Sequence, residues 1–276
     1  MALPFDAIGT EYPEVRARVE LAASLEYAAA TNDDNPLYRE GRCTPPLFAV
    51  VPTTGAMFQL LVDVVPEENL LTLLHGEQDM FFHRPLVPDM VLRTRAAAHS
   101  TRVGSTGTRF VVKVTSTDDG GALVLEQYFT LFLRGLLDGD DRGPDVPPHP
   151  PLGDARSRPV ANCSLHYDED QTFRYRAASG DPNPIHFDDA IAKAAGLPGI
   201  IVHGLCTMAM VSRAVVQTQC DGDPRRLARL AVRFTAPAFP GDDLDVRIFD
   251  AGERRFAIEA ESGGVVVLTN GYAEVR

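Results

Sequence analysis

Apolar and polar positions follow two different periods along the chain, and the same order of periods occurs twice. Each half has a helical segment (residues 13–30, then 168–178), a polar Asp/Asn/Pro loop, and an apolar, helix-compatible stretch (residues 46–65, then 205–219). Strand-like runs follow, separated by turn signals such as Asp-Asp-Gly-Gly at 118–121. The predicted strands are 79–84, 91–99, 108–115 and 122–133, then 227–236, 244–250, 255–261 and 265–275. Helices followed by consecutive strands predict an α+β fold with antiparallel sheets, and the apolar second-half helix predicts a sheet wrapped around a buried helix.

The two halves are separated by a segment rich in proline, glycine and aspartate. Residues 136–158 have almost no apolar periodicity, which is typical of an inter-domain linker. We therefore expect an N-terminal module over 1–135 and a C-terminal module over 159–276. The stretch Tyr27–Pro36 aligns without gaps on Tyr175–Pro184, with the tyrosine, two alanines, the aspartate, the asparagine and the proline identical. Such internal similarity indicates two homologous modules.

The composition of the chain narrows the kinds of binding partner and the cellular compartment that are expected. The 276 residues carry a net charge of −12, which argues against nucleic acid as a partner because phosphate binding needs a basic face. No apolar run is expected to approach the length of a membrane span, and the N-terminus does not resemble a secretory signal, so the sequence predicts a soluble, cytoplasmic protein. The cysteines lie outside any metal-ligand spacing and are expected to be free thiols.

The most informative segment is the loop after the second helical segment. It packs Asp181, Asn183 and His186 between Pro182 and Pro184, which fix their own φ angles and stiffen the loop. A carboxylate and an imidazole held at fixed distances can grip one water molecule from two sides, and imidazole titrates near neutral pH. The same residue types also form Asx-turns and helix N-caps, so spacing alone leaves a purely structural loop open.

A second candidate lies where the apolar second-half helix begins. Gly204 lets a ligand approach the backbone, and a helix N-terminus offers free N–H groups and the positive end of the helix dipole. Such a position suits a thioester carbonyl that becomes an enolate oxygen, although a simple turn before the helix stays open. For His203 the residues favour a structural role, with the imidazole hydrogen-bonded to backbone.

These residues resemble a known family. Ser179–Asp188, with Ala194–Pro198 and Val202–Thr207 after it, is similar to the hydratase 2 motif of the MaoC-like, (R)-specific enoyl-CoA hydratases. In the first half, Thr44–Phe48 and Leu74–Gln78, with His83-Arg-Pro85 following, resemble the N-terminal domain of the same family. The resemblance covers most of both modules and implies a double hot-dog fold, in which each sheet wraps a central helix.

The resemblance also implies roles for residues and partners. Asp181 and His186 would activate water and pass a proton to C2, Asn183 would position the pair, and the Gly204 N–H would stabilise the enolate oxygen. The candidate substrate-binding residues are Ser179, Gly180, His203 and Arg233. The substrate would be an acyl-CoA thioester, with coenzyme A as part of the substrate, no metal and no other cofactor. A homodimer without a membrane or nucleic-acid partner is expected.

The first copy departs from the motif at one position. Asp33 and Asn35 remain, but Tyr38 stands where the histidine would be, and a phenol cannot replace imidazole in proton transfer at neutral pH. We expect this module to have lost catalysis and to shape the acyl pocket. The predicted reaction is hydration of trans-2-enoyl-CoA to (R)-3-hydroxyacyl-CoA in fatty acid or steroid side-chain breakdown, on long or bulky acyl chains. A dehydratase in lipid or polyketide synthesis, a hot-dog thioesterase and a non-catalytic partner subunit are the alternatives.

Overall fold

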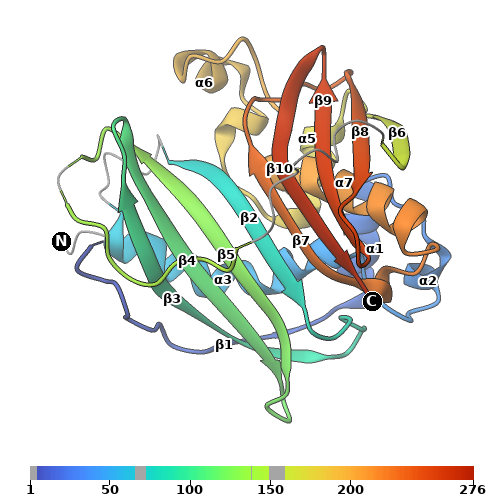
Figure 1. Cartoon of the computed structure of the whole chain (residues 1–276), viewed down its shortest axis with the longest axis horizontal. Helices are drawn as coiled ribbons and strands as arrows, with labels where there is room; N and C mark the ends of the chain where they lie inside the picture. The colour runs from blue at the N-terminus through green and yellow to red at the C-terminus, as the bar shows by residue number, and fades with distance from the viewer. Residues whose placement is uncertain (1–4, 66–72, 138, 149–158) are drawn as a thin grey trace. The chain divides into compact units, whose positions relative to one another are not determined.

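The computed structural model describes residues 5–65, 73–137, 139–148 and 159–276 (Figure 1). Residues cluster by contact into two compact units. Unit 1 comprises residues 1–18, 52–84 and 90–149, and unit 2 comprises 19–51, 85–89 and 150–276. The predicted modules and linker stay a prediction, because residues 138 and 149–158 of the linker lie outside the described residues and the units are discontinuous in sequence.

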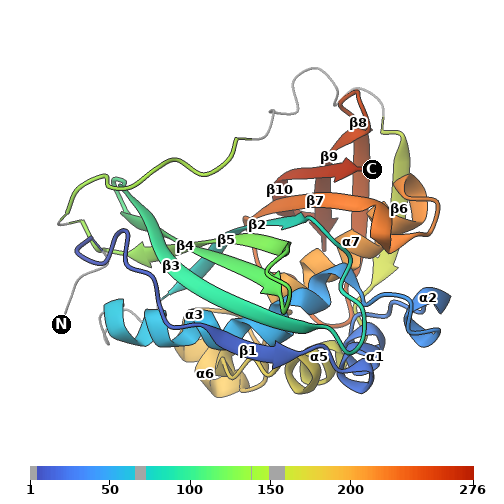
Figure 2. The same ribbon diagram turned by 90° about the horizontal axis from the view of Figure 1, so that it is seen from below.

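Unit 1 is an antiparallel sheet with one long helix against it. Its strands lie in the order β1-β3-β4-β5-β2. They are β1 (Val15–Arg18), β2 (Leu74–Phe82), β3 (Val91–Val103), β4 (Gly107–Asp118) and β5 (Leu123–Arg134). The helix α3 (Val50–Val64) lies along one face of β3, β4 and β5, as Figure 2 shows. Its residues Ala56, Leu60 and Val64, spaced at four, are buried together with alternate residues of those strands and form the core of the unit.

Unit 2 repeats the arrangement around a second helix. The strand order is β7-β10-β9-β8-β6, again antiparallel. The strands are β6 (Ala161–His166), β7 (Leu227–Phe234), β8 (Asp243–Asp250), β9 (Arg255–Ser262) and β10 (Val265–Val275). The central helix α7 (Gly204–Gln219) contacts β6, β7 and β8 and is buried over most of its surface (Figure 1). The α+β class, and a sheet with a central helix in each unit, are therefore confirmed.

The remaining helices of unit 2 come from both halves of the sequence. They are α1 (Leu21–Ala30), α2 (Pro36–Arg39), η1 (Pro46–Ala49), α5 (Gln171–Ser179), η3 (Pro184–His186), α6 (Asp189–Ala194) and η4 (Pro224–Arg226). Helices α1 and α5 pack against each other. The helix that carries the first copy of the Asp/Asn/Pro loop thus lies beside the helix that carries the second.

Two edge strands, β1 and β6, were not predicted from the sequence. The predicted helix over 13–30 is wrong in its first part, where β1 pairs with β3, and β6 was not predicted. Both alternate apolar and polar residues as a strand does, but the alternation lasts only four residues in β1 and six in β6, and it was overlooked. The prediction of free cysteines is confirmed for all four, three of which are buried.

One segment corrects the expectation about membrane-length apolar runs. Among the described residues, Pro46–Val64 forms a helix of 19 residues that is long and apolar enough to cross a membrane by length and composition alone. The core helix of a globular domain meets the same criteria. Since Ala56, Leu60 and Val64 pack against the unit 1 sheet, the segment serves as the core helix of that unit.

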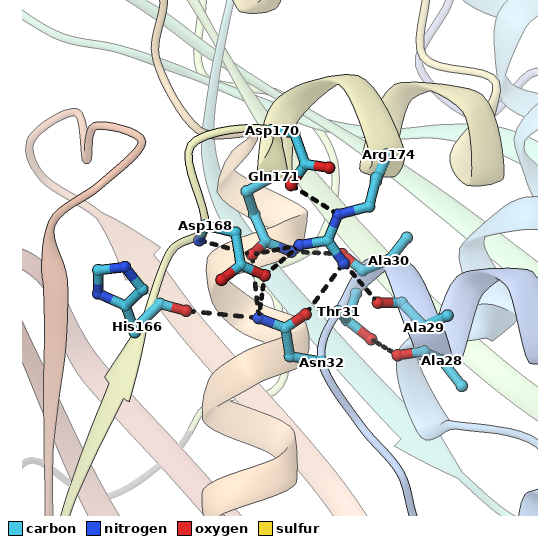
Figure 3. Close-up of polar contacts among 10 residues, drawn as sticks. All are labelled: Ala28, Ala29, Ala30, Thr31, Asn32, His166, Asp168, Asp170, Gln171 and Arg174. Carbon is cyan, nitrogen blue, oxygen red and sulfur yellow. Dashed lines mark hydrogen bonds and ion pairs between the residues drawn. The ribbon is translucent and has the colours of Figure 1, made fainter.

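A polar network joins the end of α1 to the start of α5 (Figure 3). The Arg174 guanidinium donates to the Ala29 carbonyl at 2.9 Å and to Asn32 Oδ1 at 3.1 Å, and it pairs with Asp168. Gln171 Nε2 donates to the Ala30 carbonyl at 2.5 Å. These carbonyls belong to the last turn of α1, where donors four residues further along the helix run out, and the Ala29 carbonyl has only a long bond at 3.3 Å from the Asn32 N–H. Residues of the second copy therefore cap the helix of the first.

Replacing Arg174 with methionine should lower the free energy of unfolding by about 1–2 kcal/mol, since it removes a charged donor from two partly buried bonds, to the Asn32 amide and the Asp168 carboxylate. Equilibrium denaturation in urea measures the change. The matched control is Lys193→Met, which removes an exposed i,i+4 pair with Asp189 and should change stability by at most about 0.5 kcal/mol. Equal effects of the two substitutions would show that the network contributes no more than a surface ion pair.

Candidate active site

The Asp181 loop is held by hydrogen bonds over short sequence distances. Helix α5 ends at Gly180, whose φ of 74° is a left-handed C-cap. Ser179 Oγ accepts from the Asp181 N–H at 3.2 Å, Asp181 Oδ1 accepts from the Asn183 N–H at 2.9 Å, and Asn183 Oδ1 accepts from the Ile185 N–H at 3.3 Å. The Asx-turns considered as an alternative are thus present, and they are what fixes the carboxylate. No described residue donates to the second Asp181 oxygen, Oδ2, which is free to bind a ligand.

His186 is held so that one ring nitrogen is committed and the other is available. Its ring is buried, with 7% of the residue exposed, and Nδ1 lies 2.9 Å from the Ile201 carbonyl oxygen. Because a carbonyl only accepts, Nδ1 carries the hydrogen, and the neutral ring keeps its lone pair on Nε2. Burial lowers the pKa of His186, and the Ile201 carbonyl and Asp181 oppose that shift. The ring is therefore a neutral base at neutral pH.

Asp181, His186 and His203 form one cluster, with a potential ligand atom from each within 4.8 Å of the others. Such a group could hold a metal by distance alone. The rings of His186 and His203, however, are stacked, with centroids 3.7 Å apart and planes inclined by 24°. Imidazole lone pairs lie in the ring plane, so two stacked rings direct them side by side rather than at one ion. The geometry favours proton chemistry, and the expected absence of a metal stays a prediction.

Gly204 is the first residue of α7, after His203 in the N-cap position. Among the described residues, none accepts a hydrogen bond from the N–H of Gly204 or of Leu205, whereas the Cys206 and Thr207 N–H groups both donate to the His203 carbonyl. A Cβ at position 204 would lie 3.2 Å from the Phe234 ring, so a larger residue would push against the sheet. The backbone at Gly204 thus presents an unpaired donor at the positive end of the helix.

For His203 the expected hydrogen bond to backbone is wrong. Neither of its ring nitrogens has a partner among the residues that the structure describes, and both are shut off from solvent. Of the two stacked histidines, His186 is the one that is hydrogen-bonded to backbone.

Of the other predicted substrate-binding residues, Ser179 and Gly180 lie close to the catalytic candidates and Arg233 does not. Ser179 and Gly180 lie in the Asp181 loop itself. Arg233 precedes Phe234 on β7, and successive strand residues point to opposite faces. Since the Phe234 ring faces Gly204, the Arg233 side chain leaves the sheet on the other side, and the structure does not bring it into the cluster.

The first copy of the loop has the same backbone pattern but is closed on itself. Asn35 Oδ1 accepts from the Leu37 N–H at 3.1 Å, as Asn183 does for Ile185 in the second copy. The Tyr38 hydroxyl donates to Asp33 Oδ2 at 3.0 Å, and both side chains are buried. The carboxylate oxygen that is open in the second copy is thus occupied in the first. This supports, without testing, the prediction that the first copy has no catalytic role.

Two tyrosines were missed as members of the site. The Tyr175 ring lies 4.8 Å from the His203 ring, and its hydroxyl lies 3.2 Å from that of Tyr27. These are the first residues of the two aligned repeats. Their identity in both copies was the available signal.

Models of two protein families match the chain. The MaoC like domain matches residues 150–270, which include the Asp181 loop and α7, and the MFE-2 hydratase 2 N-terminal domain matches residues 38–135. The two matches follow the two halves of the internal repeat.

Individual proteins agree with the family models. A probable enoyl-CoA hydratase 2 of Dictyostelium discoideum is 31% identical over 242 residues, which cover 83% of this chain and 81% of that protein. The crystal structure of a MaoC-like dehydratase from Phytophthora capsici superposes with a TM-score of 0.88 at 26% identity, covering 99% of this chain and 97% of that one. A Mycobacterium tuberculosis protein with a double hot-dog fold gives a TM-score of 0.58 at 16% identity, covering 98% and 96%. The predicted double hot-dog fold is confirmed.

Proposed function

We propose that this chain, a member of the MaoC-like hydratase 2 family of hydro-lyases, adds water to trans-2-enoyl-CoA and forms (R)-3-hydroxyacyl-CoA. The observation that carries the proposal is the closeness of the His186 imidazole to the Asp181 carboxylate. A ring nitrogen of His186 and a carboxylate oxygen of Asp181 lie within 4.8 Å of each other, which suits one water molecule bound between the two side chains.

The proposed reaction uses the chain's own groups at each step. His186 Nε2 accepts a proton from the bound water as the water oxygen bonds to C3 of the enoyl group. Negative charge then develops on the thioester oxygen, where the Gly204 N–H and the positive end of α7 stabilise it. Return of a proton from the Asp181–His186 pair to C2 completes the addition, with no net proton consumed. Asn183 holds the loop that positions the pair.

The same site serves dehydration, because the reverse reaction passes through the same enolate. The likeness to a MaoC-like dehydratase makes this the second candidate. We propose hydration in the breakdown of fatty or steroid acyl chains as the physiological direction, with long or bulky acyl groups as substrates. The closed Asp33–Tyr38 pair supports a first module that contributes to the acyl pocket rather than to catalysis.

Three further expectations belong to the proposal. The reaction needs no metal or redox cofactor, because the proton transfers are assigned to Asp181 and His186 and the stacked rings do not aim at one ion. The protein is a cytoplasmic homodimer without a membrane or nucleic-acid partner. Four free cysteines and a net charge of −12 support the compartment and the absence of nucleic acid.

Purified protein incubated with trans-2-enoyl-CoA esters of short, long and steroid-like acyl groups tests the proposal. Loss of the conjugated enoyl absorbance, with an (R)-3-hydroxyacyl-CoA product by chiral chromatography, is the expected result, and the preferred ester identifies the acyl class. Release of free CoA would instead identify a thioesterase. No turnover of any CoA ester, with turnover of the matching acyl carrier protein ester, would move the assignment to carrier-bound synthesis.

A further inference from the structure

The ring of His203 meets its neighbours through its faces and not through its nitrogens. One face lies against His186 with centroids 3.7 Å apart, and Tyr175 packs at 4.8 Å with its plane inclined by 46°. Only 1% of the residue is exposed. Both nitrogens are shut off from solvent and have no partner among the described residues. The packing contacts of His203 are therefore made by its ring, although one of its nitrogens lies within 4.8 Å of ligand atoms of Asp181 and His186.

The position of His203 is fixed by backbone as well as by packing. It is the N-cap residue of α7, and its carbonyl accepts from the Cys206 and Thr207 N–H groups at 3.0 and 3.1 Å. The preceding Val202 N–H donates to the Ala238 carbonyl at 2.8 Å. Because backbone hydrogen bonds hold the chain at His203 and at the residue before it, the ring presents a fixed surface to His186.

The neutral charge state of the His203 ring suits its role as a surface for His186. Burial, His186 and Arg176 together lower the pKa of His203 to about 2, so the ring is neutral at neutral pH. Proton uptake from water would convert His186 to an imidazolium. A cation is attracted to the face of a neutral aromatic ring but repelled by a second cation. A neutral ring in this place can therefore remain against His186 in both of its protonation states.

From Tyr175 the ring contacts continue into the first copy of the repeat. The Tyr175 hydroxyl lies 3.2 Å from the Tyr27 hydroxyl, and the Tyr27 ring packs edge-on against Phe48 at 5.8 Å. All of these side chains are fully buried. The first copy has lost its histidine, yet its equivalent tyrosine holds the second copy's tyrosine in place.

We propose that His203 is a positioning residue, a flat aromatic platform that holds His186 for proton transfer and is supported from behind by Tyr175 and, from the first copy, by Tyr27. The inference rests on the proposed function in that His186 is taken to be the base. It assigns His203 a role through its ring face, in place of the substrate contact expected from sequence. It also gives the first copy a direct part in the site.

Three substitutions at 203 separate a platform from a polar contact. His203→Phe keeps a flat ring without nitrogens, His203→Gln keeps polar atoms without a ring, and His203→Ala keeps neither. We expect kcat for His203→Phe within about 3-fold of wild type, and a loss of about 10- to 100-fold for the other two with little change in KM, since a misplaced base costs up to about 10²-fold. A His203→Gln variant that is active while His203→Phe is not would overturn the platform.

A measurement on His186 itself makes the test independent of turnover. In NMR titration of the imidazole signals, loss of the ring at 203 should admit water and raise the pKa of His186 in the Ala and Gln variants, while the Phe variant keeps the wild-type value. A purely structural role would leave all folded variants with the same titration, which would sink the proposal. If the wild type hydrates no ester but this titration pattern holds, the proposed function fails and the platform survives.

The support from the first copy is tested by a double-mutant cycle. Tyr27→Phe and Tyr175→Phe each remove one partner of the same hydrogen bond. We expect each to lower kcat by about 2- to 5-fold and the double variant to be no worse than the worse single one, as contacts of one pair are not additive. Losses that multiply in the double variant would show that the two hydroxyl groups act separately.

Discussion

Replacing Asp181 with asparagine, or His186 with alanine, should lower kcat/KM for hydration of a trans-2-enoyl-CoA by about 10²- to 10⁴-fold, the usual contribution of an acid–base group. Asparagine keeps the oxygen that accepts from the Asn183 N–H, so the loop should keep its shape while losing the negative charge. Alanine at 186 removes Nε2 and also the hydrogen bond to Ile201. Steady-state kinetics with the preferred ester measures both effects.

The first copy of the repeat supplies the matched control. Asp33→Asn changes the equivalent carboxylate, and the asparagine can still accept from the Tyr38 hydroxyl. We expect kcat/KM within about 3-fold of wild type, because that oxygen is already bound and lies in the copy without a histidine. A loss at Asp33 as large as that at Asp181 would mean that the first copy takes part in the chemistry. Full activity of both Asp181→Asn and His186→Ala would remove the pair from the mechanism.

Replacing His203 with phenylalanine should make the protein more resistant to acid. In the folded protein His203 stays neutral because its pKa is lowered to about 2, whereas in the unfolded chain a histidine takes up a proton below about pH 6.5. The unfolded state therefore binds more protons, and wild-type stability falls as pH drops from about 6.5 toward 2. At pH 5 the wild type has lost about 2 kcal/mol of stability in this way. The phenylalanine variant has no titrating group at position 203 and does not show this loss.

Urea denaturation of wild type and His203→Phe at pH 7 and at pH 5 measures this effect. The quantity of interest is the change, between the two pH values, in the stability difference between the two proteins. The variant should gain stability relative to wild type by about 2 kcal/mol between the two pH values, whatever its stability at pH 7. Leu230→Val, at a buried position without a titratable group, is the control and should cost about 1 kcal/mol equally at both pH values. A gap between wild type and His203→Phe that does not change with pH would show that the imidazole at 203 takes up a proton as readily in the folded protein as in the unfolded chain.

Much of the site could be predicted because its chemistry is local. Asp181, Asn183 and His186 lie within six residues, and the hydrogen bonds that shape the loop span only two positions each. Such contacts depend on residue type and turn geometry, which a single sequence displays. The loss of the histidine at Tyr38 was visible for the same reason, since it is a change of one residue within a recognisable repeat.

What the sequence alone determined is therefore the repeat, the α+β class, the central helices and the loop with its catalytic candidates. The strands β1 and β6 were not predicted, because their alternation of apolar and polar residues lasts only four and six residues. Only the tertiary structure decided that Ile201 fixes the hydrogen on His186, that His203 stacks against it, and that Tyr27 meets Tyr175 across 148 positions of sequence. Ring stacking and the pairing of distant hydroxyl groups leave no periodic trace in a sequence, since they arise only when separately encoded elements are packed together.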